Sequence, residues 1–189
     1  MLKRSIFLLC SLAVLMAAVS SCIFDPNPTP PTPPKPVQKE ENLTERWHVL
    51  NNIEVAYNKR RSDIYSKLLD VDFTFFYTEG DVGGGGVPVQ WGRDVEDPAT
   101  AGLLGDADKV DMDIKWEDGL SWVKVIPASA PAEEWFTTTV FYDFTIDIGE
   151  TTYVPDAGSK AQFTVRNDGT AETPKWQLVE FRDLGGPNS

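Results

Sequence analysis

The chain has 189 residues and a formal net charge of −12, from 17 basic and 29 acidic side chains. Nucleic acid phosphates repel a surface of this charge, so we expect no nucleic acid partner. The two cysteines, Cys10 and Cys22, lie near the N-terminus, and we expect the core to hold without disulfides.

The first residues have the order of a secretory signal peptide. Lys3 and Arg4 precede an apolar run over residues 6–19, and Ser20 and Ser21 are small residues at a cleavage point. The apolar run is too short for a comfortable transmembrane helix. We therefore predict that residues 1–21 are removed, together with Cys10.

The sequence Val19-Ser20-Ser21-Cys22 resembles the lipobox of bacterial lipoproteins. The resemblance implies that the Cys22 thiol takes a diacylglycerol and that its new amino group takes a further acyl chain such as palmitate. Two or three acyl chains anchor a protein stably, whereas one is marginal. Ile23 follows the cysteine where Asp would favour the inner membrane, so the expected location is the outer membrane of the cell envelope. The alternative is an ordinary signal peptide that leaves Cys22 as a free thiol.

A proline-rich tether follows the lipidation site. Residues 23–41 contain seven of the fourteen prolines and cannot form a packed core. An extended polyproline segment rises about 3.1 Å per residue, so the tether could span on the order of 50 Å. A proline-rich ligand for another domain is the alternative. We divide the chain into a signal peptide (1–21), a lipidated tether (22–41), one domain (42–185) and a short tail (186–189).

Helical signals come first in the domain. Asn42 and Glu45 have capping-box spacing, which predicts a helix from there to about Lys59. His48 lies off the apolar stripe of this helix and is predicted to be a surface residue. A second short helix is predicted from Ser62 to residue 69, and a third from the segment that begins at Trp91 through residue 104.

Strand signals dominate the second half. Four consecutive glycines, 83–86, are not followed by Lys-Ser/Thr, so they indicate a loop and not a phosphate cradle. An Asn167-Asp168-Gly169 turn indicates a hairpin. Strands are predicted by composition or alternation over 73–77, 110–116, 120–126, 136–148, 160–166 and 175–183. Helices followed by antiparallel strands indicate an α+β fold.

Four segments together resemble one known superfamily. They are Ala56-Tyr57-Asn58-Lys59-Arg60, Leu69-Asp70-Val71-Asp72-Phe73, Trp91-Gly92-Arg93-Asp94 and the closing Trp176–Asp183. In this order they resemble nuclear transport factor 2-like proteins, which include ketosteroid isomerases, scytalone dehydratase and polyketide cyclases (SnoaL-like proteins). The resemblance implies helices packed on a strongly curved antiparallel sheet, a cone-shaped, cystatin-like roll with an apolar pocket. Such a cone hosts enzymes, binding modules and dimerisation domains.

Glu54 lies within the apolar stripe of the first helix, where a bare carboxylate would be costly to bury. One hypothesis makes it a general acid or base with Tyr57 beside it. The other makes it a structural carboxylate paired with Arg93 or Arg182. The residues that we predict to line a ligand pocket are Glu54, Tyr57, Trp91, Arg93 and Tyr142.

Other chemistries have little support. His48 is the only histidine and Cys22 is expected to be lipidated, so a nucleophilic triad is not expected. Zinc lacks suitable ligands, and we predict no metal and no cofactor. A calcium site would lie in an acidic cluster, but the cluster lacks EF-hand spacing and is better explained as a solvated face. Its members are Asp106, Asp108, Asp111, Asp113, Glu117 and Asp118.

The sequence therefore predicts a lipid-anchored envelope protein that acts as a small-molecule-binding or protein-interaction module. The expected partners are the membrane through its lipid and an apolar small molecule. One alternative is a small isomerase-like or dehydratase-like enzyme with Glu54 as its pocket carboxylate. The other is a structural domain that forms a homodimer.

Overall fold

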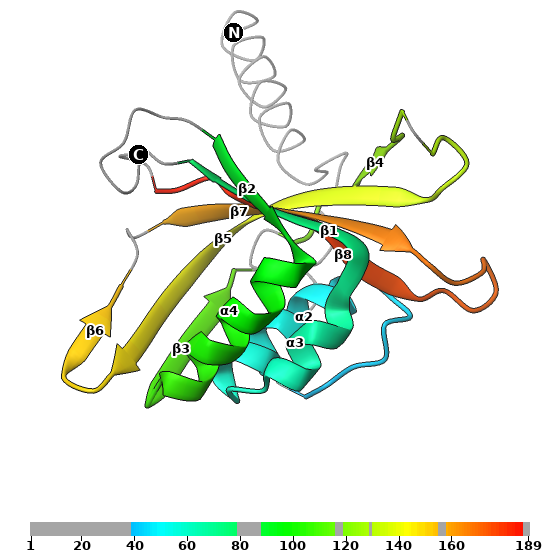
Figure 1. Cartoon of the computed structure of the whole chain (residues 1–189). Coiled ribbons are helices and arrows are strands. Elements are labelled where there is room, and N and C mark those ends of the chain that lie inside the picture. Colours follow the sequence, from blue (N-terminus) through cyan, green and yellow to red (C-terminus); the bar gives the residue numbers. More distant parts are fainter. Residues whose placement is uncertain (1–38, 79–87, 116–118, 129, 155–157, 187–189) are drawn as a thin grey trace, which may run out of the picture. The chain divides into compact units, whose positions relative to one another are not determined.

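The computed structural model describes residues 39–78, 88–115, 119–128, 130–154 and 158–186. In this part of the chain three helices lie along one face of a strongly curled eight-stranded sheet (Figure 1). The predicted signal peptide, Cys22, nearly all of the tether and the glycines 83–86 fall outside the described residues. Among the described residues, no helix is long and apolar enough to cross a membrane.

The helices are α2 (Arg46–Asn58), α3 (Ser62–Leu68) and α4 (Arg93–Asp106). Helix α2 ends where the sequence predicts, but it is more deeply buried than predicted. Ten consecutive residues, 48–57, are buried, so the helix is enclosed on all sides and not amphipathic. The prediction that His48 is a surface residue is wrong, because this side chain is only 8% exposed.

Helix α2 also begins later than predicted. Its N-cap is Glu45 and not Asn42, and the Glu45 amide donates to Nδ1 of His48 at 3.1 Å. The carbonyl of Leu43 accepts the amide of Trp176 at 2.7 Å. This bond draws the preceding turn onto strand β8 (Trp176–Asp183), so the first helical turn forms only after it.

The segment that leads into the domain is fixed to helix α2 by two asparagines. The side-chain oxygen of Asn52 accepts the Glu41 amide at 2.8 Å, and its nitrogen donates to the Glu41 carbonyl at 2.9 Å. Asn51 donates to the carbonyl of Lys39 at 2.7 Å. These bonds satisfy two polar side chains that are almost completely buried.

The strands agree with the predicted ones in order, with two short additions, β2 and β6. They are β1 (Leu69–Thr78), β2 (Pro88–Gly92), β3 (Lys109–Ile114), β4 (Val123–Val125), β5 (Trp135–Ile148), β6 (Thr151–Tyr153), β7 (Ser159–Asn167) and β8 (Trp176–Asp183). Their spatial order is β2-β1-β8-β7-β5-β3, and β4 and β6 also pair with β5. The β7–β8 hairpin is confirmed.

The sheet is mixed and not wholly antiparallel, because β1 and β8 run parallel. These strands are far apart in sequence, so no hairpin turn sets their relative direction. Strand β8 also carries a bulge against β7. Thr164 lies opposite Glu180 and Val165 lies opposite Leu178, which leaves Val179 as the extra residue. A bulge bends the strand and increases its twist, in keeping with the curl of the sheet.

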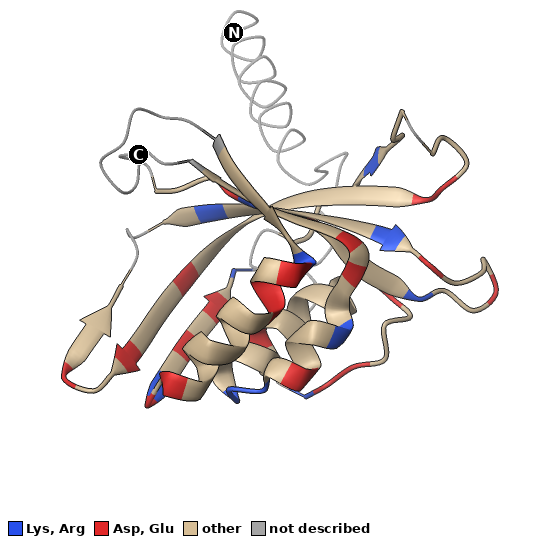
Figure 2. Cartoon of the chain, in the orientation of Figure 1, with Lys and Arg blue, Asp and Glu red and all other residues tan. Residues whose placement is uncertain are grey.

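The two faces of the sheet differ in character. The inner face carries buried apolar side chains such as Val140, Phe163 and Phe181, which join the core with helix α2. The next residues along the same strands, such as Thr137 and Glu180, point to the outer face. Acidic side chains are spread over the described helices and strands and do not gather on one element (Figure 2).

Candidate functional site

A buried carboxylate, Glu96, lies at the centre of a polar cluster between helices α3 and α4 and strand β2. Its Oε1 accepts the Tyr65 hydroxyl at 2.8 Å and the Thr100 hydroxyl at 2.9 Å. Its Oε2 accepts Nε1 of Trp91 at 2.6 Å. Glu96 is 5% exposed and lies near the N-terminus of α4, where the helix dipole stabilises negative charge. Three donors and the dipole therefore compensate its burial.

Two tyrosines beside Glu96 are held in their neutral form. Burial, and next the nearby Glu96 carboxylate, raise the pKa of Tyr57 to about 12. Burial and then Tyr57 and Glu96 raise the pKa of Tyr65 well above its ordinary value. The two rings meet edge to face, with centroids 5.5 Å apart. These phenols are hydrogen-bond donors at neutral pH and poor sources of a phenolate.

Glu54 and Tyr142 are also buried on the helix side of the sheet. Glu54 is 2% exposed. The arginines that we weighed as its partners form ion pairs elsewhere, Arg93 with Asp97 and Arg182 with Glu180. The Tyr142 hydroxyl lies 3.4 Å from Oδ1 of Asp183, and burial followed by that carboxylate raises the pKa of Tyr142.

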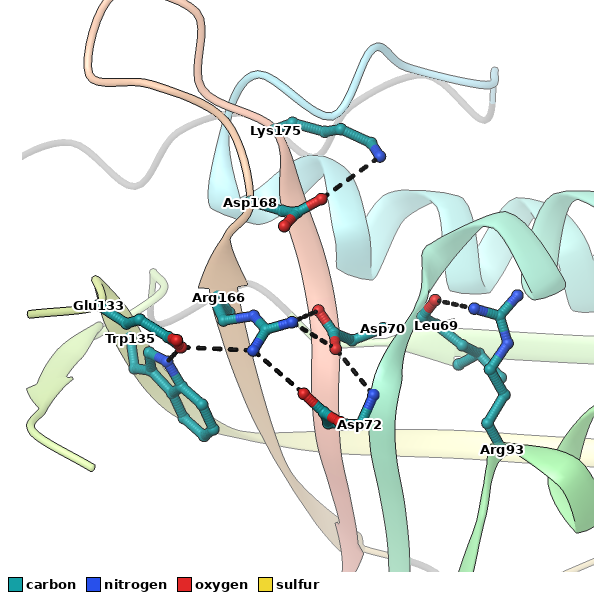
Figure 3. A network of polar contacts seen from close by, with 9 residues as sticks. All are labelled: Leu69, Asp70, Asp72, Arg93, Glu133, Trp135, Arg166, Asp168 and Lys175. Carbon is teal, nitrogen blue, oxygen red and sulfur yellow. Dashed lines mark hydrogen bonds and ion pairs between the residues drawn. The ribbon is translucent and has the colours of Figure 1, made fainter. Parts of the chain in front are cut away.

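Arg93 is tied to the end of a neighbouring helix. It donates to the carbonyl of Leu69 at 2.8 Å and to the carbonyl of Ser66 at 2.9 Å (Figure 3 shows the bond to Leu69). These carbonyls lie at the C-terminus of α3, where a helix leaves acceptors unsatisfied and a cation is favourable. The side chain therefore joins α4 to α3.

The structure thus brings Tyr57 and Trp91 together around Glu96 and directs Arg93 to helix α3. The ligand pocket that we predict from Glu54, Tyr57, Trp91, Arg93 and Tyr142 stays a prediction. Sequence reasoning missed Glu96, because an acidic residue in the first turn of a helix is usually exposed. Its spacing of four from Thr100 is the signal that could have marked it.

A second candidate site lies on the outer face of the sheet, and we call it the outer groove. It has a volume of about 380 Å³, within the range of about 300–1,000 Å³ of small-molecule sites. Strands β5, β7 and β8 form its floor, and the chain at and after β4 forms one wall. The lining residues are Val125, Pro127, Trp135, Thr137, Gln162, Thr164, Glu180 and Arg182.

A charged network fixes the Trp135 side of the groove (Figure 3). Nε1 of Trp135 donates to Oε2 of Glu133 at 2.8 Å. The same oxygen lies 3.3 Å from Nη1 of Arg166, whose guanidinium centre is 6.0 Å from the Trp135 ring. Nη2 of Arg166 contacts both carboxylate oxygens of Asp70 at 2.7 Å, and Nη1 reaches Asp72 at 3.3 Å. Asp70 is 1% exposed, so this pair is buried at one end.

The opposite side of the groove has polar groups with unused bonding capacity. Arg182 donates from Nε to Glu180 at 3.1 Å, and its guanidinium lies 3.8 Å from the centre of the Phe76 ring. Within the described residues its two terminal nitrogens have no acceptor, and the side-chain amide of Gln162 has no partner. The Thr164 and Thr137 hydroxyls are 3.4 Å apart, and Thr137 donates to the carbonyl of Phe163.

The described members of the acidic cluster do not point to a common site. Asp108 accepts the Gly149 amide, and Asp111 and Asp113 pair with Lys109 and Lys115. Glu117 and Asp118 lie outside the described residues. Among those described, no three His, Cys, Asp or Glu side chains are grouped to hold a metal. The alternation of buried and exposed residues along β3 agrees with a solvated face.

No protein-family model and no curated protein matches the sequence. A proposed aromatic ring hydroxylase from Novosphingobium aromaticivorans superposes with a TM-score of 0.51, at 9% identity over 73% of this chain and 85% of that one. A conserved protein from Planctomyces limnophilus also gives 0.51, at 16% identity over 71% and 88%. An NTF2-like protein with a cystatin-like fold, also from N. aromaticivorans, gives 0.46 at 12% identity over 75% and 79%.

The two structures with a TM-score of 0.51 show that the chain shares their fold. Its curled sheet around three helices is the architecture expected from the resemblance to nuclear transport factor 2-like proteins, so that expectation of the fold is confirmed. At these identities the likeness concerns the fold alone, and a nuclear transport factor 2-like fold does not fix an activity.

Proposed function

We propose that this protein is a lipid-anchored binding module of the bacterial cell envelope, and that its domain binds a small molecule in the outer groove. The lipobox-like sequence before Cys22, followed by Ile23, supports an anchor in the outer membrane. The proline-rich tether supports a domain that is held away from the lipid surface.

The observation that carries the binding role is the unused hydrogen-bonding capacity in the groove. A rigid apolar wall with a few convergent polar groups is the usual composition of a ligand site. Trp135 is held by Glu133 and Arg166, while Gln162 and the terminal nitrogens of Arg182 have no hydrogen-bond partner among the described residues. The groove therefore needs little rearrangement to bind, which lowers the entropic cost.

The interior supports an enzyme less well. The Glu96 carboxylate already accepts three hydrogen bonds, and the raised pKa of Tyr57 keeps its proton in place. A general acid or base needs access to its substrate and a pKa near the working pH. These groups suit a structural role, and Glu54 remains the acid or base that the enzyme hypothesis would use.

The anchor is tested by replacing Cys22→Ser and following labelled palmitate and cell fractionation. The natural chain should incorporate the label and sediment with membranes, whereas the variant should lose the label and appear in the soluble fraction. Equal labelling and sedimentation of both chains would contradict the anchor.

The groove is tested by a nuclear magnetic resonance screen of small fragments against the full chain. Binding fragments should shift the amide signals of Gln162, Thr164 and Arg182, and Arg182→Gln should remove those shifts. Shifts confined to Glu54 and Tyr57 would instead move the site to the interior. Such a result would favour the pocket predicted from the sequence, and Glu54→Gln would then be the next variant.

A further inference from the structure

Trp135 lines the outer groove, and its indole side chain consists of carbon atoms apart from one nitrogen. Its only polar atom, Nε1, already donates to Glu133. Glu133 and Arg166 hold the indole from one side, and Asp70 holds Arg166 with two contacts of 2.7 Å (Figure 3). The groove therefore has an aromatic wall whose orientation is set before any ligand arrives.

The polar side of the groove offers donors and acceptors together. Among the described residues, Arg182 has two terminal nitrogens without an acceptor, Gln162 offers both a carbonyl and an amino group, and Glu180 keeps a second carboxylate oxygen. Arg182 and Glu180 are 38% and 29% exposed, so solvent or a ligand reaches both. Their charges cancel, and the site does not select for a charged ligand.

The bulge in β8 places these groups on one surface. Because Val179 is the extra residue, Glu180 comes opposite Thr164, and Thr164 comes opposite Thr137. Arg182 lies opposite Gln162 in the next row of the outer face. The rows put the polar groups beside the aromatic wall, within one groove of about 380 Å³.

Few ligand classes match an apolar flat wall and closely spaced donors and acceptors of zero net charge. A sugar ring has a face of C–H groups that packs on an aromatic ring, whose face carries partial negative charge. Its neighbouring hydroxyls each donate and accept, as Gln162, Glu180 and Arg182 require. We propose that the outer groove binds an uncharged carbohydrate stacked on Trp135, an inference that rests on the proposed function of the groove as a binding site.

Two other classes fit less well. An inorganic anion would be attracted by Arg182 but repelled by the Glu180 carboxylate that Arg182 contacts. A wholly apolar molecule would cover Gln162 and Arg182 and leave their polar groups without partners, which costs binding free energy.

The test is isothermal titration of the full chain in a detergent without a sugar headgroup. The probes are four uncharged trisaccharides (maltotriose, cellotriose, triacetylchitotriose and mannotriose), with inorganic phosphate and triglycine as comparators. We expect at least one trisaccharide to bind, with a Kd of millimolar order or tighter. Trp135→Ala and Arg182→Gln should each weaken that binding about tenfold or more, in the manner of central contact residues.

Phe141→Ala is the matched control. Phe141 is an exposed aromatic residue on the same strand and face as Trp135 but does not line the groove. Its replacement should leave the Kd within about twofold. Arg182→Gln provides a second safeguard, because Arg182 is partly exposed and its replacement removes ligand contacts without removing a core side chain.

Absence of trisaccharide binding would overturn the carbohydrate inference. If phosphate or triglycine then bound, and Arg182→Gln weakened it, the groove would still be a binding site and the proposed function would stand. Trisaccharide binding that survived both Trp135→Ala and Arg182→Gln would place the sugar elsewhere and overturn the inference as well.

Discussion

The Glu96 cluster and the outer groove lie on opposite faces of one sheet. They differ in the burial of their polar groups and in how many hydrogen bonds those groups already form. Glu96 is 5% exposed, and each of its oxygens accepts at least one hydrogen bond. In the groove, Arg182 is 38% exposed and uses one nitrogen of three on Glu180. The difference separates the two roles of polar side chains. A buried and satisfied group stabilises a fold, whereas an exposed group with spare bonds is available to a partner.

The largest expected effect comes from removing the interior carboxylate. Glu96→Ala leaves the Tyr65 hydroxyl, the Trp91 indole and the Thr100 hydroxyl without their acceptor. We expect a loss of about 4 kcal/mol in the free energy of unfolding, measured by urea denaturation. Thr100→Val removes a single bond and should cost about 1 kcal/mol. A loss below that of Thr100→Val would mean that the cluster does not stabilise the fold.

Part of the fall in stability at alkaline pH should come from the same cluster. Unfolded tyrosine loses its proton near pH 10, whereas Tyr57 in the folded chain keeps it until about 12. The folded state then binds more protons between these values, so stability must fall as pH rises from 10 to 12. The contribution of Tyr57 is on the order of 2–3 kcal/mol. Urea denaturation of Tyr57→Phe at several alkaline pH values should give a shallower fall, and an unchanged slope would contradict it.

The Asp70–Arg166 pair should have an intermediate effect, because it is buried at one end and supports the groove. Asp70→Asn removes the bidentate partner of Arg166 while Asp72 and Glu133 remain. We expect a loss of about 2 kcal/mol in unfolding free energy. Asp72→Asn is the control, because Asp72 is 69% exposed and should change stability by about 0.5 kcal/mol or less. Equal effects of the two variants would contradict the buried pair.

The smallest effect on stability should come from the groove itself. Arg182→Gln breaks a partly exposed ion pair and a contact with Phe76. The thermal midpoint should move by no more than the equivalent of about 0.5 kcal/mol. A ligand that binds the groove should nevertheless lose affinity for this variant. A large loss of stability in Arg182→Gln would mean that Arg182 is a structural residue. The groove would then no longer differ in this respect from the Glu96 cluster.

Local patterns in the sequence were enough for much of the fold. Alternation identified β3, and the turn at Asn167 identified the β7–β8 hairpin. The start of α2 was wrong because the Leu43 carbonyl bonds to Trp176, a residue that is distant in sequence. The prediction that His48 is exposed was wrong because helix α2 is buried on all sides, although its sequence indicates a single apolar face.

The two sites depend on contacts that a sequence does not display. Glu96 receives donors from α3, β2 and its own helix, and only the last has a recognisable spacing. The groove needs the register of three strands and the one-residue bulge at Val179, because a shift of one residue would turn Glu180 to the other face. The parallel pairing of β1 and β8 likewise follows from tertiary packing and not from a turn.

The hydrogen bonds between Asn52 and the backbone of Glu41 have a mechanical consequence. Two hydrogen bonds from one side-chain amide, with a third from Asn51 to Lys39, join the entering chain to helix α2. Tension from the N-terminal side would therefore act on the enclosed helix α2, and not on a strand at the edge of the sheet. A force applied to the N-terminal side of the domain would be transmitted through helix α2 to the core around it. We therefore expect the domain to resist stretching as one unit, until helix α2 is displaced from the residues that enclose it.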